Sequence, residues 1–392
     1  MTNSTNHQPD KSHNKGPLEG LKVLEISSVI MVPFAGSILA KLGADVLRIE
    51  PPNGDSLRQT GAQRDYRVSG SVVSFWDQKR SLTLDLKSDN GRKLLSALFE
   101  NADIIITNLL ASTREKLGIT WAIIRELNPR AIFCTAQGFK TGSEWEDRPA
   151  YDDTIQAASG ICDIYRLSSG TPRLAPYVVA DKVCGITIVY SCLAALHHRS
   201  STGRGQHVEV PMMDTMVHFN LAEQLNDYAF DPPLGSAGWH RTLAPQRRPH
   251  ECRDGWVCVL PYTDKNWSAF MEHIGAPSDE YNHLQTRKGR IQHADEVHTL
   301  IESYTRVRKA ETVQDELASL GIPYSEVNSL ESLMEHDYLR SMNTISRVSN
   351  PEIGNYWRTT PNISFSESPC LSAEIEDFFK LNQSKAIEEW TR

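Results

Sequence analysis

Short β-branched runs alternate with helical patterns through the first 140 residues, and this alternation is the strongest constraint on the fold of the chain. We expect strands at 21–27, 45–50, 81–86, 103–108 and 131–139, and helices at 33–42, 89–101 and 120–127. This succession predicts an α/β fold with a Rossmann-like parallel sheet and helices on both faces. Ligands of such sheets bind at the carboxyl ends of the strands, where we expect the functional site.

The sequence changes in texture at the Asp-Pro-Pro-Leu-Gly run that begins at Asp231. With 392 residues the chain is long for a single core, which favours two domains. We expect a disordered polar tail at 1–15, the first part of a large domain at 16–229 and a smaller α+β domain at 230–329. The remaining residues, 330–392, are expected to return to the large domain and complete it.

A long apolar helix is predicted to follow Asp181, because no charged residue occurs from Val183 to Leu196. Such a helix should be buried over most of its surface. Asp181 then lies near the helix N-terminus, whose dipole would keep its carboxylate ionised at neutral pH. An ionised carboxylate facing a cleft is a candidate nucleophile. The simpler interpretation is that Asp181 only caps the helix.

Composition excludes several classes of partner. The net charge is −8 with Lys and Arg spread along the chain, which disfavours nucleic acid. The apolar run from Val183 to Leu196 is too short to span a bilayer, so we expect no membrane association. Seven irregularly spaced cysteines without a Cys-x-x-Cys pair favour reduced thiols, and the polar first 15 residues do not resemble a secretory signal. A cytoplasmic location is predicted.

Common catalytic motifs are absent from the sequence. The loop after the first expected strand, residues 28–32, has no glycine, which disfavours a dinucleotide. There is no Walker A loop, zinc-protease motif or nucleophile elbow, and no histidine occurs between His13 and His197. A Ser-His or Cys-His site on the first sheet therefore has no base. What remains is a carboxylate nucleophile, with no metal and no permanently bound cofactor expected.

An ordered series of motifs runs through the first 225 residues. It comprises Gly20-Leu21-Lys22-Val23-Leu24-Glu25, Pro33-Phe34-Ala35-Gly36, Leu42-Gly43-Ala44-Asp45-Val46, Arg48-Ile49-Glu50-Pro51, Lys79-Arg80-Ser81-Leu82, Leu84-Asp85-Leu86-Lys87, Asn128-Pro129-Arg130, Gln137-Gly138-Phe139, Gln156-Ala157-Ala158-Ser159-Gly160, Ala180-Asp181, Leu193-Ala194-Ala195-Leu196 and Thr202-Gly203-Arg204-Gly205-Gln206. The series resembles the family III CoA-transferases (CaiB/BaiF type), the group of the formyl-CoA and carnitine CoA-transferases. The likeness is strong over 16–225 and weak over the remainder.

The resemblance implies a CoA-transferase that moves CoA from an acyl-CoA thioester to a free carboxylic acid. The aspartate matching Asp181 would attack the thioester carbonyl to give an acyl-aspartyl anhydride and free CoA thiolate. The thiolate would then return to give an aspartyl-CoA thioester, and an acceptor acid would repeat the sequence in reverse. Coenzyme A enters as part of a substrate. The resemblance also implies an interlocked homodimer whose active site is shared between the large domain of one chain and the small domain of the other.

Positions that match the CoA-binding residues of the family are Ile30, Met31, Leu84, Lys87, Asn108, Lys116 and Phe139. The charges of Lys87 and Lys116 suit the phosphates of CoA, although exposed lysines on a solvated surface explain the same pattern. Gln137 is expected near the reacting centre as an oxyanion donor or an orienting group, or else only at a capped strand end.

Two alternative functions stay open. A 2-methylacyl-CoA racemase would use an aspartate matching Asp152 together with a histidine that the first domain lacks. A catalytically inactive CoA-binding relative is the second alternative. Departures from the family pattern support it: Val32 stands where a glycine commonly precedes Pro33, and the flap region at 235–241 has only two glycines and a tryptophan.

A cationic cluster follows the flap region. It consists of Arg247, Arg248 and His250. The cluster could recognise a second carboxylate on the substrate or serve a surface or interface.

Overall fold

The structure, a computed structural model, describes residues 16–65, 68–277, 279–350, 353–370 and 383–391. The tail predicted at 1–15 lies outside the described residues. The chain divides into two compact units. The first comprises Met1–Ser159, Ala175–Phe219 and Asp337–Arg392, and the second comprises Gly160–Leu174 and Asn220–His336. These ranges differ from the predicted boundaries chiefly in placing 160–174 and 220–229 with the second unit. That the units are separate folding domains stays a prediction.

The first unit is built on a six-stranded sheet in the order β5-β2-β1-β6-β7-β8, with every neighbouring pair parallel. Its strands are β1 (Lys22–Ile26), β2 (Asp45–Glu50), β5 (Arg80–Thr83), β6 (Ile104–Thr107), β7 (Ile132–Thr135) and β8 (His207–Glu209). The predicted parallel α/β sheet is thus confirmed. One expected strand, 131–139, ends already at Thr135, so Gln137 and Phe139 lie in the loop beyond it.

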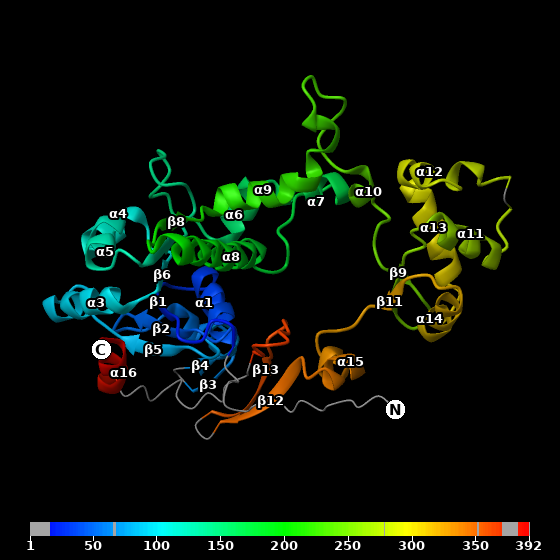
Figure 1. The fold of residues 1–392 in the computed structure, drawn as a ribbon. Coiled ribbons are helices and arrows are strands. Elements are labelled where there is room, and N and C mark those ends of the chain that lie inside the picture. Colours follow the sequence, from blue (N-terminus) through cyan, green and yellow to red (C-terminus); the bar gives the residue numbers. More distant parts are fainter. Residues whose placement is uncertain (1–15, 66–67, 278, 351–352, 371–382, 392) are drawn as a thin grey trace, which may run out of the picture. The chain divides into compact units, whose positions relative to one another are not determined.

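Helices cover both faces of this sheet (Figure 1). The helices of the first unit are α1 (Met31–Lys41), η2 (Ser56–Gln59), α2 (Gly70–Phe75), α3 (Asp89–Asn101), α4 (Ala111–Leu117), α5 (Trp121–Leu127), α6 (Asp152–Ala158), α8 (Val179–Thr202), α9 (Met212–Gln224, which enters the second unit at Asn220), α15 (Asp337–Ser341) and α16 (Gln383–Thr391). Helices α1 and α8 pack together over one face, and α3, α5 and α16 lie over the other. Two antiparallel strand pairs, β3 (Gln63–Asp65) with β4 (Val68–Ser69) and β12 (Ile345–Asn350) with β13 (Gly354–Thr359), complete the unit.

Alternation along β1 explains how the two faces differ. Leu24 and Ile26 belong to the apolar cluster that includes Phe99 of α3 and Trp390 of α16. Glu25 points to the opposite face, because successive strand residues alternate between faces. There a Cβ atom on Gly36 of α1 would lie 2.1 Å from the Glu25 carboxylate. A small residue is therefore needed where α1 crosses this buried charge.

The second unit combines a three-stranded antiparallel sheet, ordered β11-β10-β9, with several helices. Its elements are α7 (Ile161–Ser169), η3 (Asn226–Ala229), α10 (His240–Leu243), β9 (His250–Glu251), β10 (Trp256–Val259), α11 (Asp264–His273), η4 (Asn282–Leu284), α12 (Arg287–Gln292), α13 (Ala294–Thr305), α14 (Ala310–Ser319), β11 (Tyr324–Glu326) and η5 (Ser332–Glu335). Trp267, Phe270 and Leu317 lie in its apolar core.

Helix α8 is long and apolar enough to cross a membrane, judged by length and composition alone; within the described ranges it is the one helix that meets this test. Half of its apolar window is buried within the protein, and core helices of soluble proteins pass the same test. It packs on α1, α6 and β7. Helix α8 is therefore only weak support for membrane association, and the absence of a membrane partner stays a prediction.

Substitution of Gly185 tests the close approach of α8 to α1. A Cβ atom at Gly185 would lie 2.9 Å from the Met31 carbonyl oxygen and 2.9 Å from Phe34 Cδ1. Overpacking costs about 1–3 kcal/mol, whereas the higher helix propensity of alanine returns at most about 1 kcal/mol. We expect Gly185→Ala to lower the free energy of unfolding in urea. Gly70→Ala, with no atom within 4 Å of the new methyl group, is the matched control and should not lower it. Equal stability of both variants would contradict the packing described here.

Candidate active site

A cavity of about 250 Å³ lies at the carboxyl ends of β1, β6 and β7. Its lining residues come from the loops after these strands, the segment before α6, and the first turns of α8 and α9. They are Ser28, Val29, Ile30, Met31, Asn108, Leu109, Leu110, Thr113, Gln137, Gly138, Pro149, Ala150, Tyr151, Asp181 and Met212. Five predicted site residues, namely Asp181, Gln137, Ile30, Met31 and Asn108, are thus brought together. Such an edge is where parallel sheets bind ligands.

From β1 the chain adds β2 and β5 on one side of the sheet, and it then adds β6, β7 and β8 on the other side. The order of strands therefore reverses between β1 and β6, and Asn108 lies at this point. Its Oδ1 accepts a hydrogen bond from the Ser28 backbone N–H at 3.1 Å, and its Nδ2 donates to the Ser28 carbonyl at 2.9 Å. Asn108 therefore fixes the loop after β1 to the end of β6. The crevice that opens at such a reversal is the general ligand site of open α/β sheets.

Asp181 lies in the first turn of α8, and its side chain is 9% exposed. The helix N-cap is Val178, without a side-chain capping bond, so the interpretation of Asp181 as an N-cap is wrong. Its backbone N–H donates to Asp152 Oδ1 at 3.0 Å. Its carboxylate has no hydrogen-bond partner in the part of the chain that the structure describes. Both carboxylate oxygens are thus uncommitted beside the cavity.

The protonation of Asp181 differs from the sequence-based expectation. Burial, followed by the nearby carboxylates of Asp152 and Asp153, raises the pKa of Asp181 from 3.8 to about 7. We expected the helix N-terminus to keep the Asp181 carboxylate ionised at neutral pH. Its raised pKa shows that it does not keep the group fully ionised. The reason is that desolvation and two like charges act together against the anion.

A buried pair on α6 holds the first turn of α8. Gln156 Nε2 donates to Asp152 Oδ2 and, at 3.3 Å, to the Tyr177 carbonyl. Its Oε1 accepts from the Ala175 backbone N–H at 2.8 Å. Gln156 and Asp152 thus connect α6 to the segment that leads into α8. The motif at 156–160 contains Gln156, but sequence reasoning gave it no role; its spacing of four residues from Asp152 on one helix face is the signal that could have found it.

Gln137 is buried and its side-chain amide is fully used. Its Oε1 accepts from Arg114 Nη1 at 2.7 Å, and its Nε2 donates to the carbonyls of Phe139 at 2.9 Å and Glu146 at 3.2 Å. This conformation leaves no side-chain N–H of Gln137 for an oxyanion. A role as donor would require one of these bonds to break, whereas an orienting role would not.

Four residues predicted to bind CoA are not among those that line the cavity. Leu84 packs against the apolar cluster below the sheet. Lys87 and Lys116 are exposed. Phe139 is buried in edge-to-face contact with Trp145, with ring centres 5.4 Å apart. The cavity lining contains no Lys or Arg side chain, so their predicted role toward the CoA phosphates stays a prediction.

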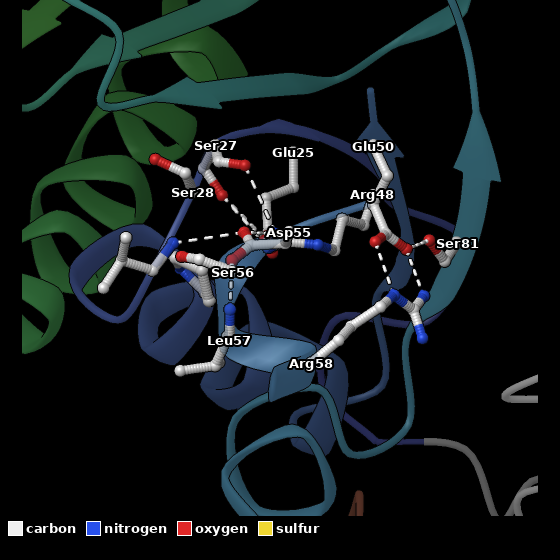
Figure 2. A network of polar contacts seen from close by, with 12 residues as sticks. Glu25, Ser27, Ser28, Arg48, Glu50, Asp55, Ser56, Leu57, Arg58 and Ser81 are labelled. Atoms are coloured by element: carbon white, nitrogen blue, oxygen red, sulfur yellow. Dashed lines mark hydrogen bonds and ion pairs between the residues drawn. The ribbon is translucent and has the colours of Figure 1, made fainter. Parts of the chain in front are cut away.

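A buried ionic network supports the loop after β1, and sequence reasoning did not find it (Figure 2). Arg48 on β2 pairs with Glu25 on β1 at 2.5 Å and with Asp55. Lys79 donates to Glu25 at 2.9 Å and to the Pro33 carbonyl at 2.8 Å. Glu25, Arg48 and Lys79 stand in the quoted motifs. Their buried pairing, however, depends on the parallel register of β1 and β2, which the motifs do not specify.

Asp55 connects this network to the loop that lines the cavity. Its Oδ2 accepts the backbone N–H of Val29 at 3.2 Å, and its Oδ1 accepts that of Leu57 at 2.8 Å. Val29 has φ of +65°, a backbone conformation that a β-branched residue rarely adopts. Such strain persists only where the surroundings determine the conformation. Asp55 therefore holds the strained loop whose residues 28–31 line the cavity.

The charges of the network balance, with two carboxylates against two cations. Burial favours the neutral form of Glu25, but Lys79 and Arg48 outweigh it, and the pKa of Glu25 is lowered. Burial lowers the pKa of Lys79 to about 8 despite the attraction of Glu25. Removing one member of such a buried set leaves an uncompensated charge.

Comparison with known proteins identifies the family. A family model described as CoA-transferase family III matches residues 18–374. The chain belongs to CoA-transferase family III. This family III enzyme is 30% identical to a succinyl-CoA:mesaconate CoA-transferase of Haloarcula marismortui, with 86% of each chain covered. It is 29% identical to a formyl-CoA:oxalate CoA-transferase of Streptomyces coelicolor and 30% identical to a succinate–glutarate CoA-transferase of Agrobacterium fabrum, with 90% and 83% of each chain covered.

Solved structures share the fold of this family III CoA-transferase. A CaiB/BaiF family protein from Brucella suis matches with a TM-score of 0.79 and 23% identity, covering 96% of this chain and 100% of that one. A hypothetical protein from Mycobacterium tuberculosis matches with a TM-score of 0.77 and 21% identity, covering 91% and 95%. At these identities the likeness shows the fold alone.

The flap region predicted from the sequence lies in the second unit of the CoA-transferase. In the flap region, the backbone N–H groups of Gly238 and Trp239 donate to the main chain and side chain of Gln224 at 2.7 and 2.9 Å. For metals, one group within the described ranges, His283, His293 and Glu296, has ligand atoms within 4.8 Å of one another. It does not line the cavity at Asp181, and the absence of a metal from the reaction stays a prediction.

Replacing Asp181 should stabilise the CoA-transferase at alkaline pH. Its pKa in the folded protein lies above 3.8, so folding favours the protonated form and stability is lost as pH rises from about 4 to 7. A rise to about 7 corresponds to at most roughly 4 kcal/mol. We expect Asp181→Asn to unfold at higher urea than the wild type at pH 8, with a smaller gain at pH 5. Glu144→Gln, at an exposed carboxylate that does not contribute to the raised pKa of Asp181, is the control and should change stability little. A destabilised Asp181→Asn at pH 8 would count against the buried, unpartnered carboxylate.

Replacing Arg48 should destabilise the enzyme strongly. Arg48→Met leaves Glu25 and Asp55 without their shared cation, which we expect to cost about 3–5 kcal/mol in chemical unfolding. Arg92→Met removes the same charge from an exposed pair with Asp89 and should cost at most about 1 kcal/mol. If both variants lost equal stability, the buried network would not support the loop as described.

Proposed function

We propose that this family III enzyme transfers CoA between an acyl-CoA and a free carboxylic acid through covalent intermediates on Asp181. The observation that carries the proposal is the Asp181 carboxylate, which lines the cavity at the strand ends and has no hydrogen-bond partner among the described side chains and backbone groups. A structural carboxylate at this depth would be paired or hydrogen-bonded. An unpaired one is suited to attack.

Each proposed step conserves atoms and charge. An Asp181 oxygen bonds to the thioester carbon, the C–S bond breaks, and the CoA thiolate leaves with the electron pair. The thiolate then attacks the Asp181 carbonyl of the mixed anhydride, which gives aspartyl-CoA and releases the donor acid with one former Asp181 oxygen. The acceptor carboxylate attacks aspartyl-CoA, and the returning thiolate takes the acceptor acyl group. Thioester and anhydride therefore exchange without an outside energy source.

Only the ionised form of Asp181 can act in the first step. Because its pKa is about 7, both protonation states are present at neutral pH. Asp152 has two effects: its Oδ1 fixes the Asp181 backbone, and its charge opposes ionisation of the Asp181 side chain. We infer that burial has two effects on Asp181. A smaller fraction of its carboxylate is ionised, but the ionised carboxylate is poorly solvated and therefore more reactive.

The surroundings of Asp181 support roles for the other predicted residues. Ile30, Met31 and Asn108 would contact the pantetheine arm, because they line the cavity from the β1 and β6 loops. Gln137 would orient its loop, held by Arg114. Leu84 and Phe139 would act through packing, and Lys87 and Lys116, both exposed, are free to meet the CoA phosphates.

We also propose that the enzyme works as an interlocked homodimer in the cytoplasm. Helix α8 exposes Ile186 and Tyr190, which are 52% and 58% exposed, and α9 exposes Phe219. Large apolar side chains of this kind on neighbouring helices favour cover by a second chain. For the acceptor, the relatives named for mesaconate, oxalate and glutarate favour a dicarboxylic acid, while carnitine-like acids stay open.

The racemase alternative is less favoured by the site. It needs two acid–base groups on opposite faces of the substrate. No histidine occurs among the residues that line the described cavity, and Asp152 is committed to the Asp181 backbone and Gln156. An inactive binding protein is disfavoured because Asp181 is retained at the cavity.

Transfer of an oxygen atom tests the proposal. A screen of acyl-CoA donors against carboxylic acids, read by mass, first identifies a working pair. With the acceptor acid labelled by ¹⁸O in its carboxylate, each turnover should leave one labelled oxygen on Asp181, because the acceptor supplies the bridging oxygen of the second anhydride. Peptide mass spectrometry after several turnovers measures this.

Two variants accompany the labelling experiment. Asp181→Ala should reduce turnover by at least about a thousandfold, as expected for loss of a nucleophile. Asp153→Asn removes a nearby exposed carboxylate and should keep both turnover and label. Turnover without label on Asp181 would contradict the covalent route, and uptake of solvent deuterium at the α-carbon instead would establish the racemase alternative.

A further inference from the structure

The second unit contains a pocket of about 80 Å³ whose charged lining is cationic. Arg241, Arg247, Arg287 and Arg290 line it, together with Tyr262, His298 and aliphatic side chains of β10, α12 and α13. No Asp or Glu is among the residues that line it. All of these residues lie within the second unit, and none lines the cavity at Asp181.

Three of the four arginines have no carboxylate partner. Arg290 is fully engaged, because it pairs with Asp264 at 2.5 Å and donates to the carbonyls of Leu284 and Gln285. Arg241, Arg247 and Arg287, by contrast, pair with no carboxylate in the described ranges. Arg241 is half-buried and Arg247 and Arg287 are exposed, so water solvates their guanidinium groups, and an anion in the pocket would gain charge-assisted hydrogen bonds from them.

Tyr262 holds two of the free arginines in place. The guanidinium carbons of Arg241 and Arg287 lie 5.4 and 4.8 Å from its ring centre. Arg287 also donates a hydrogen bond to the Tyr262 hydroxyl. That hydroxyl therefore accepts from Arg287 and still has its own proton to donate. Two fixed cations and one O–H donor are thus preorganised around one pocket, which lowers the entropy cost of binding.

The cationic character of the pocket comes from arginine rather than histidine. His298 stacks on His250 with ring centres 5.4 Å apart. Burial is the main cause that lowers the pKa of both, and the pKa of His250 falls to about 4. At neutral pH both rings are uncharged. Arginine stays protonated across this range, so the positive charge of the pocket does not depend on pH.

The structure also divides the cationic cluster predicted from the sequence. Arg247 lines this pocket. Arg248 instead pairs with Glu302 at 3.0 Å, and His250 is buried. Arg247, Arg248 and His250 therefore do not line one common pocket, and their other interpretation, a role at a surface or interface, stays a prediction. Arg247 lines its pocket together with Arg241 and Arg287. The cluster predicted from the sequence included neither of these two arginines.

We propose that this pocket binds an oxyanion group, a phosphate or a carboxylate at the end of a small molecule, through Arg241, Arg247, Arg287 and the Tyr262 hydroxyl. A volume of about 80 Å³ accommodates a few water molecules, which suits one such group. The group could belong to a phosphorylated compound such as CoA or to a dicarboxylic acid. The proposal does not depend on Asp181 being the nucleophile.

Equilibrium binding to the full-length protein tests this site. The probes are inorganic phosphate, succinate, CoA and 3′-dephospho-CoA, each titrated by calorimetry against wild type, Arg241→Gln, Arg287→Gln and Arg248→Gln. Loss of one charged hydrogen-bond donor should weaken binding of the matching probe by about tenfold or more. Arg248→Gln removes the same charge outside the pocket and should leave binding within about twofold of wild type. Tyr262→Phe, which keeps the ring, should weaken binding less than either arginine variant.

The probes separate the possible sources of the anion. Weaker binding of phosphate and CoA, with dephospho-CoA unchanged, identifies a phosphate monoester. Weaker binding of succinate alone identifies a carboxylate. The proposal is overturned if no probe binds differently to Arg241→Gln or Arg287→Gln than to Arg248→Gln. Repeating the titrations in Asp181→Ala should not change these differences, so failure of the pocket and failure of the covalent route are read separately.

Discussion

The hydrogen bond from the Asp181 backbone N–H to Asp152 Oδ1 is the contact on which the site depends. It fixes the first turn of α8 against α6 and brings two carboxylates close together in a poorly solvated place. Asp152 has its own partners, but the Asp181 carboxylate has none among the residues described, so its raised pKa has no local compensation. The unpaired Asp181 carboxylate lowers the stability of the folded protein and at the same time supplies a reactive group. Active sites often show this trade-off.

The sheet and its functional edge could be predicted from the sequence because local patterns determine them. β-Branched runs marked β1, β2 and β6, and parallel topology then placed Ile30, Asn108 and Asp181 at one edge. The polar supports could not be predicted. Arg48 meets Glu25 only through the register of β1 and β2, and Asp152 meets Asp181 across 29 residues of sequence.

The mistaken expectation about the charge of Asp181 has one physical cause, which is burial. The helix start at Asp181 suggested a stabilised anion, but desolvation and Asp152 outweigh it. Burial also affects Gln137, because its amide is already satisfied by Arg114, Phe139 and Glu146, which favours the orienting role over the donor role. Sequence shows which groups are present, whereas their solvation and partners emerge only when distant segments pack together.

The central claim is that Asp181 becomes covalently attached to CoA. The most direct measurement is mass spectrometry of the protein after brief mixing with an acyl-CoA donor and quenching with hydroxylamine, which converts an aspartyl thioester to a hydroxamate. The account predicts a hydroxamate on the peptide that contains Asp181, dependent on the donor. An unmodified Asp181 in an enzyme that turns over under the same conditions would contradict it.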